Sequence, residues 1–250
     1  MLTAQRRDLL LERLRRDGRL VAREIAGELG VTEDMIRRDL RELASAGLVQ
    51  RVYGGALPVS PAVADYAART AVAPEGKRRV AASAAALVEP GSVVALDGGT
   101  TALAVVDALP RDLRATIVTH SPTIAVALAE HRDIDVEIIG GRLFRHSMVA
   151  SGATALDAVG RLRVDVFLLG VTGVHAEAGL TTGDREEATL KRAIAARAGD
   201  TYVLASSEKI GAASAFEVLP LAAVSGVVTD ADDGPAMSAL AAAGVQLIRA

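Results

Sequence analysis

The sequence predicts an α/β protein of two domains, a small helical N-terminal domain followed by a larger domain with a mainly parallel sheet. Helical periodicity dominates the first 57 residues, whereas short β-branched runs alternate with helical stretches from Lys77 onward. The segment between them lacks a regular period. With 250 residues, half of them apolar, the chain is long enough to bury a core in each domain. We expect the domains to span residues 1–57 and 77–250, joined by a linker at 58–76.

Charge is distributed unevenly along the chain. Residues 1–57 carry 11 arginines and nine acidic residues, net +2, whereas the remainder has a net charge of −5. A basic segment attached to an acidic one is typical of a nucleic-acid-binding module with a separate partner domain. Three Tyr, three Phe and no Trp leave little material for stacking unpaired bases, which favours duplex DNA over single strands.

The chain contains no cysteine, which excludes disulfides and thiolate metal sites and suits a reducing compartment. No apolar run approaches the roughly 20 residues needed to span a bilayer, so we expect a cytoplasmic protein without membrane association. The four histidines show no paired ligand spacing, so neither a metal nor a cofactor is expected. They are His120, His131, His146 and His175.

Two helices and a tight turn open the N-terminal segment. We expect Thr3 to cap the first helix, which should end at Asp17 and Gly18. A short extended piece at residues 19–21 precedes a second helix, which should end at Gly30, the small residue typical of a helix-turn-helix turn.

The third helix, capped by Thr32, has one apolar and one cationic face. Its apolar positions lie within about 60° of one another at 100° per residue, and its arginines occupy the opposite half. The apolar positions are Ile36, Leu40 and Leu43, and the arginines are Arg37, Arg38 and Arg41. Periodicity alone leaves two interpretations, an ordinary solvated face or a face that contacts DNA.

A hairpin should follow, because Gly47 ends the third helix and residues 48–53 form a strand before Gly54 and Gly55. Residues 32–40 (TEDMIRRDL) closely resemble the recognition-helix signature of the DeoR family of bacterial regulators, and residues 51–56 (RVYGGA) resemble the motif that closes its wing. Met35 departs from the Thr usual in that family. The resemblance implies a winged helix-turn-helix that binds double-stranded operator DNA.

Arginine pairs with guanine or with phosphate oxygens, and a recognition helix fits the major groove. Which of Arg37 and Arg38 contacts a base and which a phosphate stays open at this stage. We expect contacts from the helix and, mainly to the DNA backbone, from the wing. The expected DNA-binding residues are Thr32, Arg37, Arg38, Arg41, Arg51 and Tyr53.

After the linker, which should hold a short helix around Tyr66, seven short apolar runs are predicted as strands of a parallel sheet covered on both faces. They are residues 92–96, 116–119, 136–139, 164–169, 202–205, 226–229 and 245–248, and helical stretches at 102–109, 122–129 and 186–198 separate several of them.

Polar, glycine-rich turns follow these strands. Residues 97–101 (DGGTT) lead into a helix and offer backbone N–H groups and hydroxyls to an anion, although such turns also simply cap helices. Ligands of parallel sheets bind at the carboxyl ends of the strands, so we expect a site here. Hydroxyls at 119 and 121, glycines at 140, 141, 152, 170 and 173, and Lys209 follow other strands.

These segments, with residues 187–192 and 228–230, resemble the effector domain of the DeoR family over essentially the rest of the chain. That domain is similar in fold to ribose 5-phosphate isomerase. The resemblance implies a phosphorylated sugar or related metabolite as effector, and His120 replaces the usual asparagine. The expected contacts are Asp97, Gly99, Thr100, Thr101, Thr119, Ser121, Gly152 and Lys209.

An isomerase-like enzyme with an attached DNA-binding module is the alternative. Isomerases carry an acidic loop where this chain has residues 170–173 (GVTG), which cannot transfer a proton, although Asp97 and Glu187 remain candidate bases. A nonspecific architectural DNA protein would leave the larger domain unexplained. We therefore expect a regulator, typically a repressor, rather than an enzyme, acting as a homo-oligomer (dimer or tetramer).

Overall fold

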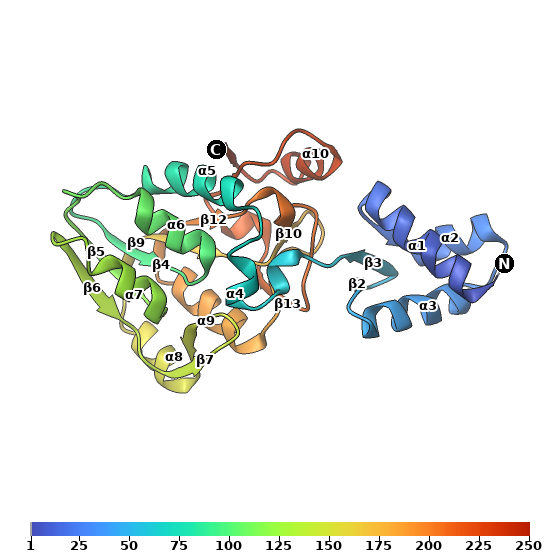
Figure 1. Cartoon of the computed structure of the whole chain (residues 1–250), viewed down its shortest axis with the longest axis horizontal. Coiled ribbons are helices and arrows are strands. Elements are labelled where there is room, and N and C mark those ends of the chain that lie inside the picture. Colours follow the sequence, from blue (N-terminus) through green and yellow to red (C-terminus); the bar gives the residue numbers. More distant parts are fainter. Residues whose placement is uncertain (1) are drawn as a thin grey trace.

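The computed structural model describes residues 2–250, and the chain forms two bodies joined by a short connection (Figure 1). In residues 2–58, three helices and three strands form the N-terminal body. These elements are α1 (Thr3–Asp17), β1 (Leu20–Val21), α2 (Ala22–Leu29), α3 (Glu33–Ser45), β2 (Val49–Val52) and β3 (Gly55–Pro58). The predicted helix-turn-helix with a hairpin wing is confirmed.

The ends of the three helices follow local sequence with one exception. Gly18 and Gly30 end α1 and α2 in the left-handed region, with φ of 72° and 62°. Thr32 caps α3, and its hydroxyl accepts a hydrogen bond from the Met35 amide (3.3 Å). The expected cap at Thr3 was wrong, because Thr3 is already the first helical residue and the Leu2 amide donates to the Gln5 side chain instead (3.2 Å).

The wing depends on a close approach of two strands. The strand order is β1-β3-β2, and β1 pairs with β3 antiparallel, with Val21 opposite Gly55. A Cβ atom at Gly55 would lie 1.8 Å from the Leu20 carbonyl oxygen, so no larger residue fits there. Gly54, with φ of 77°, supplies the left-handed turn between β2 and β3.

A buried ion pair joins the first helix to the third. The Arg6 Nε and Asp39 Oδ2 atoms lie 2.5 Å apart, and the two residues are only 6% and 2% exposed. Arg7 donates to the other Asp39 oxygen (3.3 Å). Asp39 therefore lies on the packed side of α3, and it holds α1 against this helix.

The larger body is built on a seven-stranded sheet in which every strand is parallel to its neighbours. Each of the seven predicted runs overlaps one of its strands, so the predicted sheet is confirmed. In spatial order the strands are β15 (Leu247–Arg249), β14 (Gly226–Thr229), β12 (Ala198–Leu204), β9 (Val164–Gly170), β4 (Val93–Leu96), β5 (Ala115–Thr119) and β6 (Ile134–Ile138).

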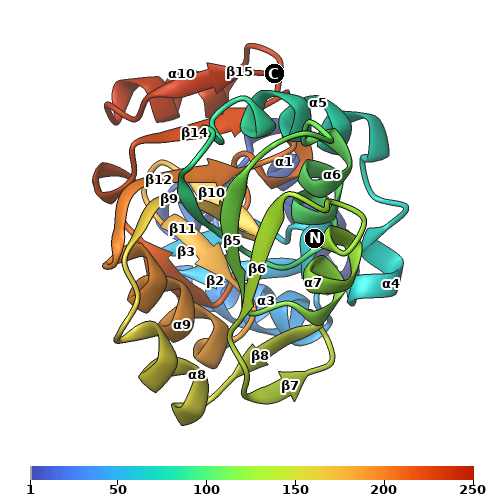
Figure 2. The ribbon, with the colours of Figure 1, turned by 90° about the vertical axis from the view of Figure 1, so that its left-hand side faces the viewer.

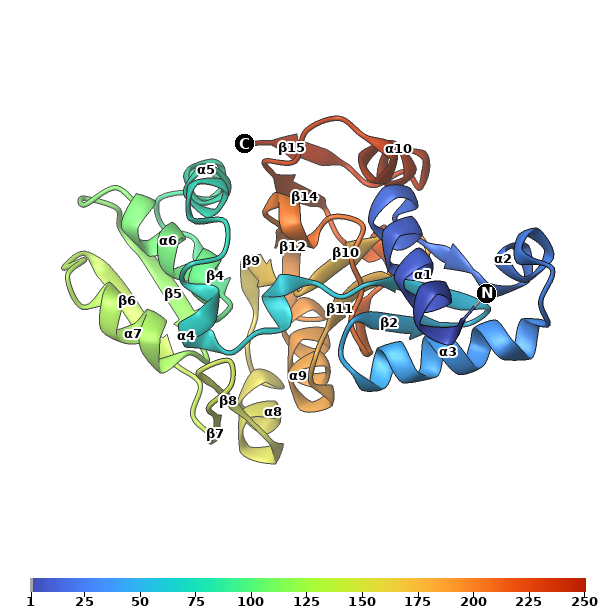
Figure 3. The ribbon, with the colours of Figure 1, turned by 45° about the vertical axis from the view of Figure 1, so that its right-hand side comes forward.

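Helices cover both faces of this sheet, and a separate apolar cluster fills each interface (Figure 3). The burial of both faces explains why a central strand such as β4 is a continuous apolar run, whereas the edge strand β6 carries Asp135 and Glu137. One face packs against α5 (Pro74–Ala85), α6 (Thr100–Ala108) and α7 (Pro122–Leu128), and the other against α8 (Ala153–Val159), α9 (Arg185–Ala195) and α10 (Pro235–Ala242).

Several short elements were not predicted. A hairpin of β7 (Arg142–Phe144) and β8 (Val149–Ser151) lies at the same end of the molecule as α8 (Figure 2). A small sheet has the order β10-β11-β13, formed by β10 (Gly173–His175), β11 (Gly179–Thr182) and β13 (Phe216–Leu219). Runs of three or four residues are too short to show a period, which explains the omission.

The small sheet also meets the N-terminal body. The Arg19 Nη1 atom lies 2.9 Å from Glu177 Oε1, just beyond β10, and Val59 forms a β-bridge with Ala213. Between the two bodies lie the short helices η1 (Pro61–Val63) and α4 (Tyr66–Arg69), the latter in the position predicted. In residues 2–250 no helix is both long and apolar enough to cross a membrane.

Replacing Asp39 with alanine should destabilise the N-terminal body, because Arg6 would remain buried without its partner. Breaking a buried pair in this way costs about 3 to 5 kcal/mol. Hydrogen exchange of the α1–α3 amides in the full-length protein measures the change. The control Asp17→Ala removes an exposed partner of Arg16 and should leave protection nearly unchanged. Equal protection in Asp39→Ala and wild type would show that the pair contributes little.

Candidate functional site

The exposed face of α3 carries the expected DNA-binding arginines. Arg38 has 77% of its side chain exposed and lies 3.7 Å from Glu42, whereas Arg37 donates to Glu33 through Nε (3.0 Å) and Nη2 (2.6 Å). Arg41 Nε donates to the Arg37 carbonyl oxygen (3.4 Å). Arg38 is thus the least engaged of the three in the free protein.

The wing presents a second exposed surface beside this helix. Tyr53, at the tip of the hairpin, is fully exposed, and Arg51 on β2 is exposed as well. Two large apolar side chains are also exposed, Met35 on α3 and Leu48 before β2. Helix and wing together offer the two kinds of contact surface that winged helices use, one for a groove and one for the backbone.

In the larger body a cavity of about 260 Å³ opens where the strands end. The carboxyl edge of a parallel sheet is the usual place for a ligand. Both the sheet and the connection between the bodies contribute to the wall. Its main segments are residues 62–63, 98–101, 146–147, 170–172, 182–184 and 208–209, together with Arg69, Val72, Lys77, Glu187 and Lys191.

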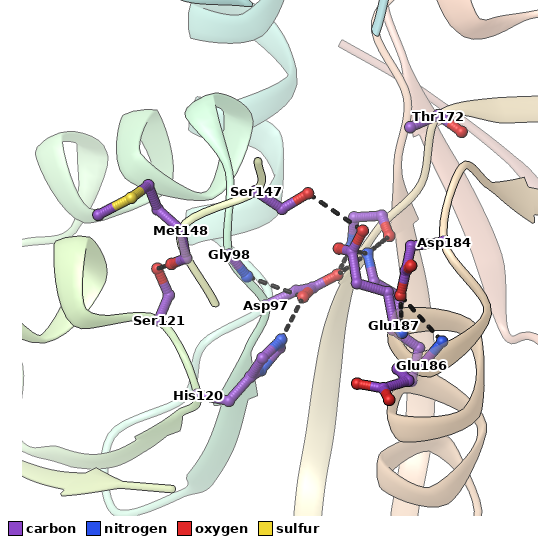
Figure 4. A network of polar contacts seen from close by, with 12 residues as sticks. Asp97, Gly98, His120, Ser121, Ser147, Met148, Thr172, Asp184, Glu186 and Glu187 are labelled. Carbon is purple, nitrogen blue, oxygen red and sulfur yellow. Dashed lines mark hydrogen bonds and ion pairs between the residues drawn. The ribbon is translucent and has the colours of Figure 1, made fainter. Parts of the chain in front are cut away.

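Behind this cavity, the carboxylate of Asp97 joins four separate segments (Figure 4). One oxygen, Oδ2, lies 2.9 Å from Lys191 Nζ and accepts from the Gly170 amide (2.8 Å). The other, Oδ1, lies 3.3 Å from His120 Nε2 and accepts from the Gly98 amide (2.8 Å). Asp97 is 1% exposed, so these partners replace all of its water.

The charges of this cluster shift one another. Burial alone would raise the pKa of Asp97, but the charge of Lys191 and the hydrogen bonds from Lys191 and the Gly98 amide outweigh burial and hold that pKa below its ordinary value. Burial would lower the pKa of Lys191, but Asp97 and Glu187 raise it above its ordinary value. Burial lowers the pKa of His120, and Asp97 only partly offsets that effect. Asp97 and Lys191 are therefore charged at neutral pH, and His120 is neutral.

The start of α9 is fixed by a second set of polar contacts (Figure 4). Asp184 caps the helix and accepts from the Glu186 and Glu187 amides (2.9 and 3.0 Å). Ser147, in the β7–β8 loop, donates to Glu187 Oε2 (3.0 Å). These bonds hold Glu187 at the cavity wall, 3.7 Å from Lys191.

The first turn of α6 faces the same cavity. Gly99, with φ of 103°, precedes Thr100 and Thr101 and leaves the amides at the start of the helix open. Lys209 Nζ donates to the Leu204 carbonyl oxygen (3.1 Å) and to Thr101 Oγ1 (3.4 Å). Burial lowers the pKa of Lys209 to about 8. A helix N-terminus beside a buried lysine is a chemically suitable site for an anion.

The expected effector residues thus divide into two groups. Gly99, Thr100, Thr101 and Lys209 line the cavity together, whereas the remaining four lie outside its lining. Ser121 donates to the Met148 carbonyl oxygen in the β7–β8 loop (3.0 Å), and Thr119 accepts from the Ser121 amide within its own loop (3.1 Å). Gly152 precedes α8, and Asp97 lies in the cluster above. Effector contacts by these residues stay a prediction.

Sequence reasoning missed part of the cavity wall. Glu187 was named only as a candidate base and Lys191 was given no role, although their spacing of four residues places them on one face of α9. Arg69 and Lys77 come from a stretch without a period, which gave no such signal. In residues 2–250 no cluster of three or more His, Cys, Asp or Glu side chains could hold a metal.

Two family models match the chain. The model described as a DeoR-like helix-turn-helix domain matches residues 6–62, and the model described as the DeoR C terminal sensor domain matches residues 72–231. The matches cover the N-terminal body and most of the larger body.

Relatives align with nearly the whole chain. The HTH-type transcriptional regulator GlpR of Haloferax volcanii is 33% identical over 99% of this chain and 98% of its own length. The glycerol-3-phosphate regulon repressor of Escherichia coli K12 is 31% identical over 92% of each chain. The transcriptional repressor GlcR of Bacillus subtilis is 29% identical over 88% of this chain and 86% of its own. All three are named as regulators or repressors of transcription.

Solved structures show weaker likeness. Ribose 5-phosphate isomerase A of Methanocaldococcus jannaschii is 21% identical, with a TM-score of 0.39, over 53% of this chain and 52% of its own. The sorbitol operon regulator SorC of Klebsiella pneumoniae is 14% identical, with a TM-score of 0.36, over 82% and 90%. At TM-scores below 0.5 these likenesses are too weak to carry a fold assignment, which stands on the strand order instead.

His120 should make the larger body sensitive to acid. An unfolded histidine titrates at about 6.5. Because the folded pKa is lower, His120 stabilises the fold fully above that pH, and the stabilisation is lost as the pH falls below it, by up to about 1.4 kcal/mol per pH unit. His120→Asn, which cannot titrate, should flatten the decline in thermal stability below pH 6.5. An equally steep decline in both proteins would contradict the assignment.

Proposed function

This chain belongs to the DeoR family of transcriptional regulators, and we propose that it is a repressor. It would release its operator when it binds a phosphorylated sugar or a related metabolite. Both family models and the named relatives make the chain a DNA-binding transcriptional regulator rather than an enzyme. The isomerase alternative is not supported. Operator and metabolite would meet the protein in the cytoplasm.

For DNA, we place α3 in the major groove and the wing against the backbone. The observation in favour is the exposed arginine face of α3, with Arg38 unpaired by any short contact and Arg37 held by Glu33 within the helix. Arg37 would have to leave Glu33 or share it when it meets a base or phosphate. Thr32 and Arg41 on the helix, and Arg51 and Tyr53 on the wing, complete the proposed surface.

For the effector, one observation carries the proposal. The open first turn of α6 faces a cavity whose buried Lys209 donates to neutral oxygens, from Leu204 and Thr101. Phosphate oxygens suit both the helix terminus and the ammonium group. A volume of about 260 Å³ suits a small metabolite, and the name of the E. coli relative makes glycerol 3-phosphate one probe to test. Asp97 would act from behind, by positioning Lys191.

We propose further that the protein binds as a symmetric homo-oligomer, either a dimer or a tetramer. One recognition helix contacts too few base pairs for selective affinity, and paired half-sites supply the rest. Effector binding would change the relative placement of two winged helices and so weaken their joint fit to the operator.

Arg37→Ala and Arg38→Ala should each weaken operator binding. An arginine that contacts guanine contributes about 1 to 3 kcal/mol of base discrimination. Binding to specific and scrambled duplexes at one salt concentration measures the loss, and footprints of the wild type should show repeated half-sites. Arg78→Ala, on the distant helix α5, is the control. Unchanged affinity in both α3 variants, or one short site bound by a monomer, would overturn this arrangement.

Thr101→Val and Lys209→Met should weaken effector binding but leave operator binding without effector intact. Each removes a donor to a charged phosphate, which costs about 1.5 to 3 kcal/mol, or roughly 10-fold to 150-fold in affinity. Calorimetry with glycerol 3-phosphate and a set of sugar phosphates, each beside its unphosphorylated parent, measures the effect. The control Thr116→Val lies on β5, outside the cavity lining. Wild-type affinity in both folded variants would rule out this phosphate site.

The pH dependence separates the two residues. A phosphate ester is mainly dianionic above its second pKa of about 6. Since the pKa of Lys209 is about 8, affinity should be highest between about pH 6 and pH 8 and fall above pH 8, as the ammonium loses its proton. The fall should reach up to about tenfold per pH unit. Thr101→Val should keep this profile, and Lys209→Met should lose it.

A further inference from the structure

The connection between the two bodies forms one wall of the cavity. Val63 in η1, Arg69 in α4 and Val72 beyond it line the cavity together with the strand ends of the larger body. Two bonds hold this segment on the β7–β8 loop: the Tyr66 amide donates to the His146 carbonyl oxygen (2.9 Å), and His146 Nε2 donates to the Val63 carbonyl oxygen (2.9 Å). The segment is thus part of the site as well as a tether (Figure 1).

Arg69 is the residue of this segment that lacks a partner. Its Nε and Nη2 atoms are buried and have no hydrogen-bond partner among residues 2–250. Its Nη1 atom faces Gly99, at 3.8 Å from where a Cβ of that residue would lie, and its guanidinium lies 6.0 Å from the centre of the Tyr66 ring. Arg69 as a whole is half-buried, but two buried guanidinium nitrogens without a partner are costly, so its position favours an anion at the start of α6.

Most other charged groups of the wall have neighbours, although one oxygen of Glu208, Oε2, is also buried without a hydrogen-bond partner among residues 2–250. Lys191 lies between Asp97 and Glu187, and Asp184 caps α9. Burial lowers the pKa of Lys77 and of Lys209, and Glu208 offsets part of that effect in both. Burial also lowers the pKa of Arg69, against the more distant charges of Glu187 and Asp97. Arginine keeps its charge in proteins, so Arg69 stays a cation, and an anion in the cavity would neutralise it.

We propose that Arg69 binds the anionic group of the effector together with the first turn of α6, so that the connecting segment itself senses whether the cavity is occupied. This inference rests on the proposed function. Arginine can pair with two phosphate oxygens at once, which would fix the position of α4 as well as that of the ligand.

A change at α4 has a short path to the DNA-binding body. The Arg69 carbonyl oxygen accepts from Lys77 Nζ (2.5 Å), which ties α4 to α5. In the other direction η1 starts at Pro61, three residues after β3 of the wing ends at Pro58. An effector that binds Arg69 would therefore restrain the segment that connects to the wing. This restraint would limit the relative positions that two winged helices can take on an operator.

The test uses the full-length protein, inorganic phosphate as the probe, and the variants Arg69→Gln, Arg69→Lys and Arg78→Gln. Phosphate should protect amides of residues 61–72 as well as 98–105 of the wild type from hydrogen exchange. Arg69→Gln should weaken phosphate binding about 10-fold to 100-fold, the factor expected for one hydrogen bond to a charged group. In Arg69→Gln, phosphate should no longer protect the amides of residues 61–72 from exchange. The amides of residues 98–105 should still be protected, but only at a higher phosphate concentration. Arg69→Lys should fall between them, since lysine keeps the charge without the planar fork.

Two further readouts separate binding from folding. Arg78 is exposed and paired with Glu75 on α5, so Arg78→Gln should behave as wild type. Without phosphate, Arg69→Gln should be at least as thermally stable as wild type, because it removes an unpaired buried charge. A stable Arg69→Gln with weak phosphate binding supports the proposal. If Arg69→Gln is unfolded both without phosphate and with it, Arg69 has a structural role and the proposal is overturned.

The remaining outcomes distinguish this inference from the proposed function. Protection of 98–105 but not of 61–72 in the wild type, or wild-type phosphate affinity in Arg69→Gln, would overturn the role of Arg69 and leave the phosphate site at α6 standing. If calorimetry shows no phosphate binding by the wild type and phosphate protects neither segment, the role of Arg69 and the phosphate site at α6 are overturned together.

Discussion

The functional edge of the α/β domain depends on one buried carboxylate. Asp97 accepts hydrogen bonds from the Gly98 and Gly170 amides and lies between Lys191 and His120, so it joins the ends of β4, β5 and β9 to α9. Such a group stays charged only because these donors replace its water. The turn before α6 and the β9 end, which both line the cavity, are held by the same bonds, so this group fixes the relative positions of two segments of the cavity wall.

The fold was largely predictable from the sequence because its strongest signals are local. Each strand of the parallel sheet overlaps a short run rich in apolar and β-branched residues, and Gly30, Thr32 and Gly54 adopt the turn and cap conformations that their residue types favour. What sequence did not reveal depends on distant partners or very short elements. Asp39 was assigned to a DNA-binding motif, yet it is buried by Arg6, 33 positions away.

The candidate site was predictable only in part, for the same reason. A glycine-threonine turn before a helix can be predicted from the local sequence, and Gly99, Thr100 and Thr101 do lie at the cavity. The hydroxyls of Thr119 and Ser121 look equivalent in sequence, but that of Thr119 is engaged within its own loop and that of Ser121 by the β7–β8 loop. Arg69 lies in a segment without periodicity, and only the folded path of the chain brings its guanidinium to Gly99.

Residues 61–72 both line the cavity and connect the two bodies, which constrains how such a protein can diverge. A substitution there that reshapes the cavity for a new metabolite also changes the connection between the two bodies. The preference for a ligand and the effect of that ligand on DNA binding therefore change together. Substitutions on the strand-end side of the cavity escape this coupling. Lineages that acquire new ligands should therefore vary first at the strand ends, and swaps of whole sensor domains should work best when the donor's tether is transferred with them.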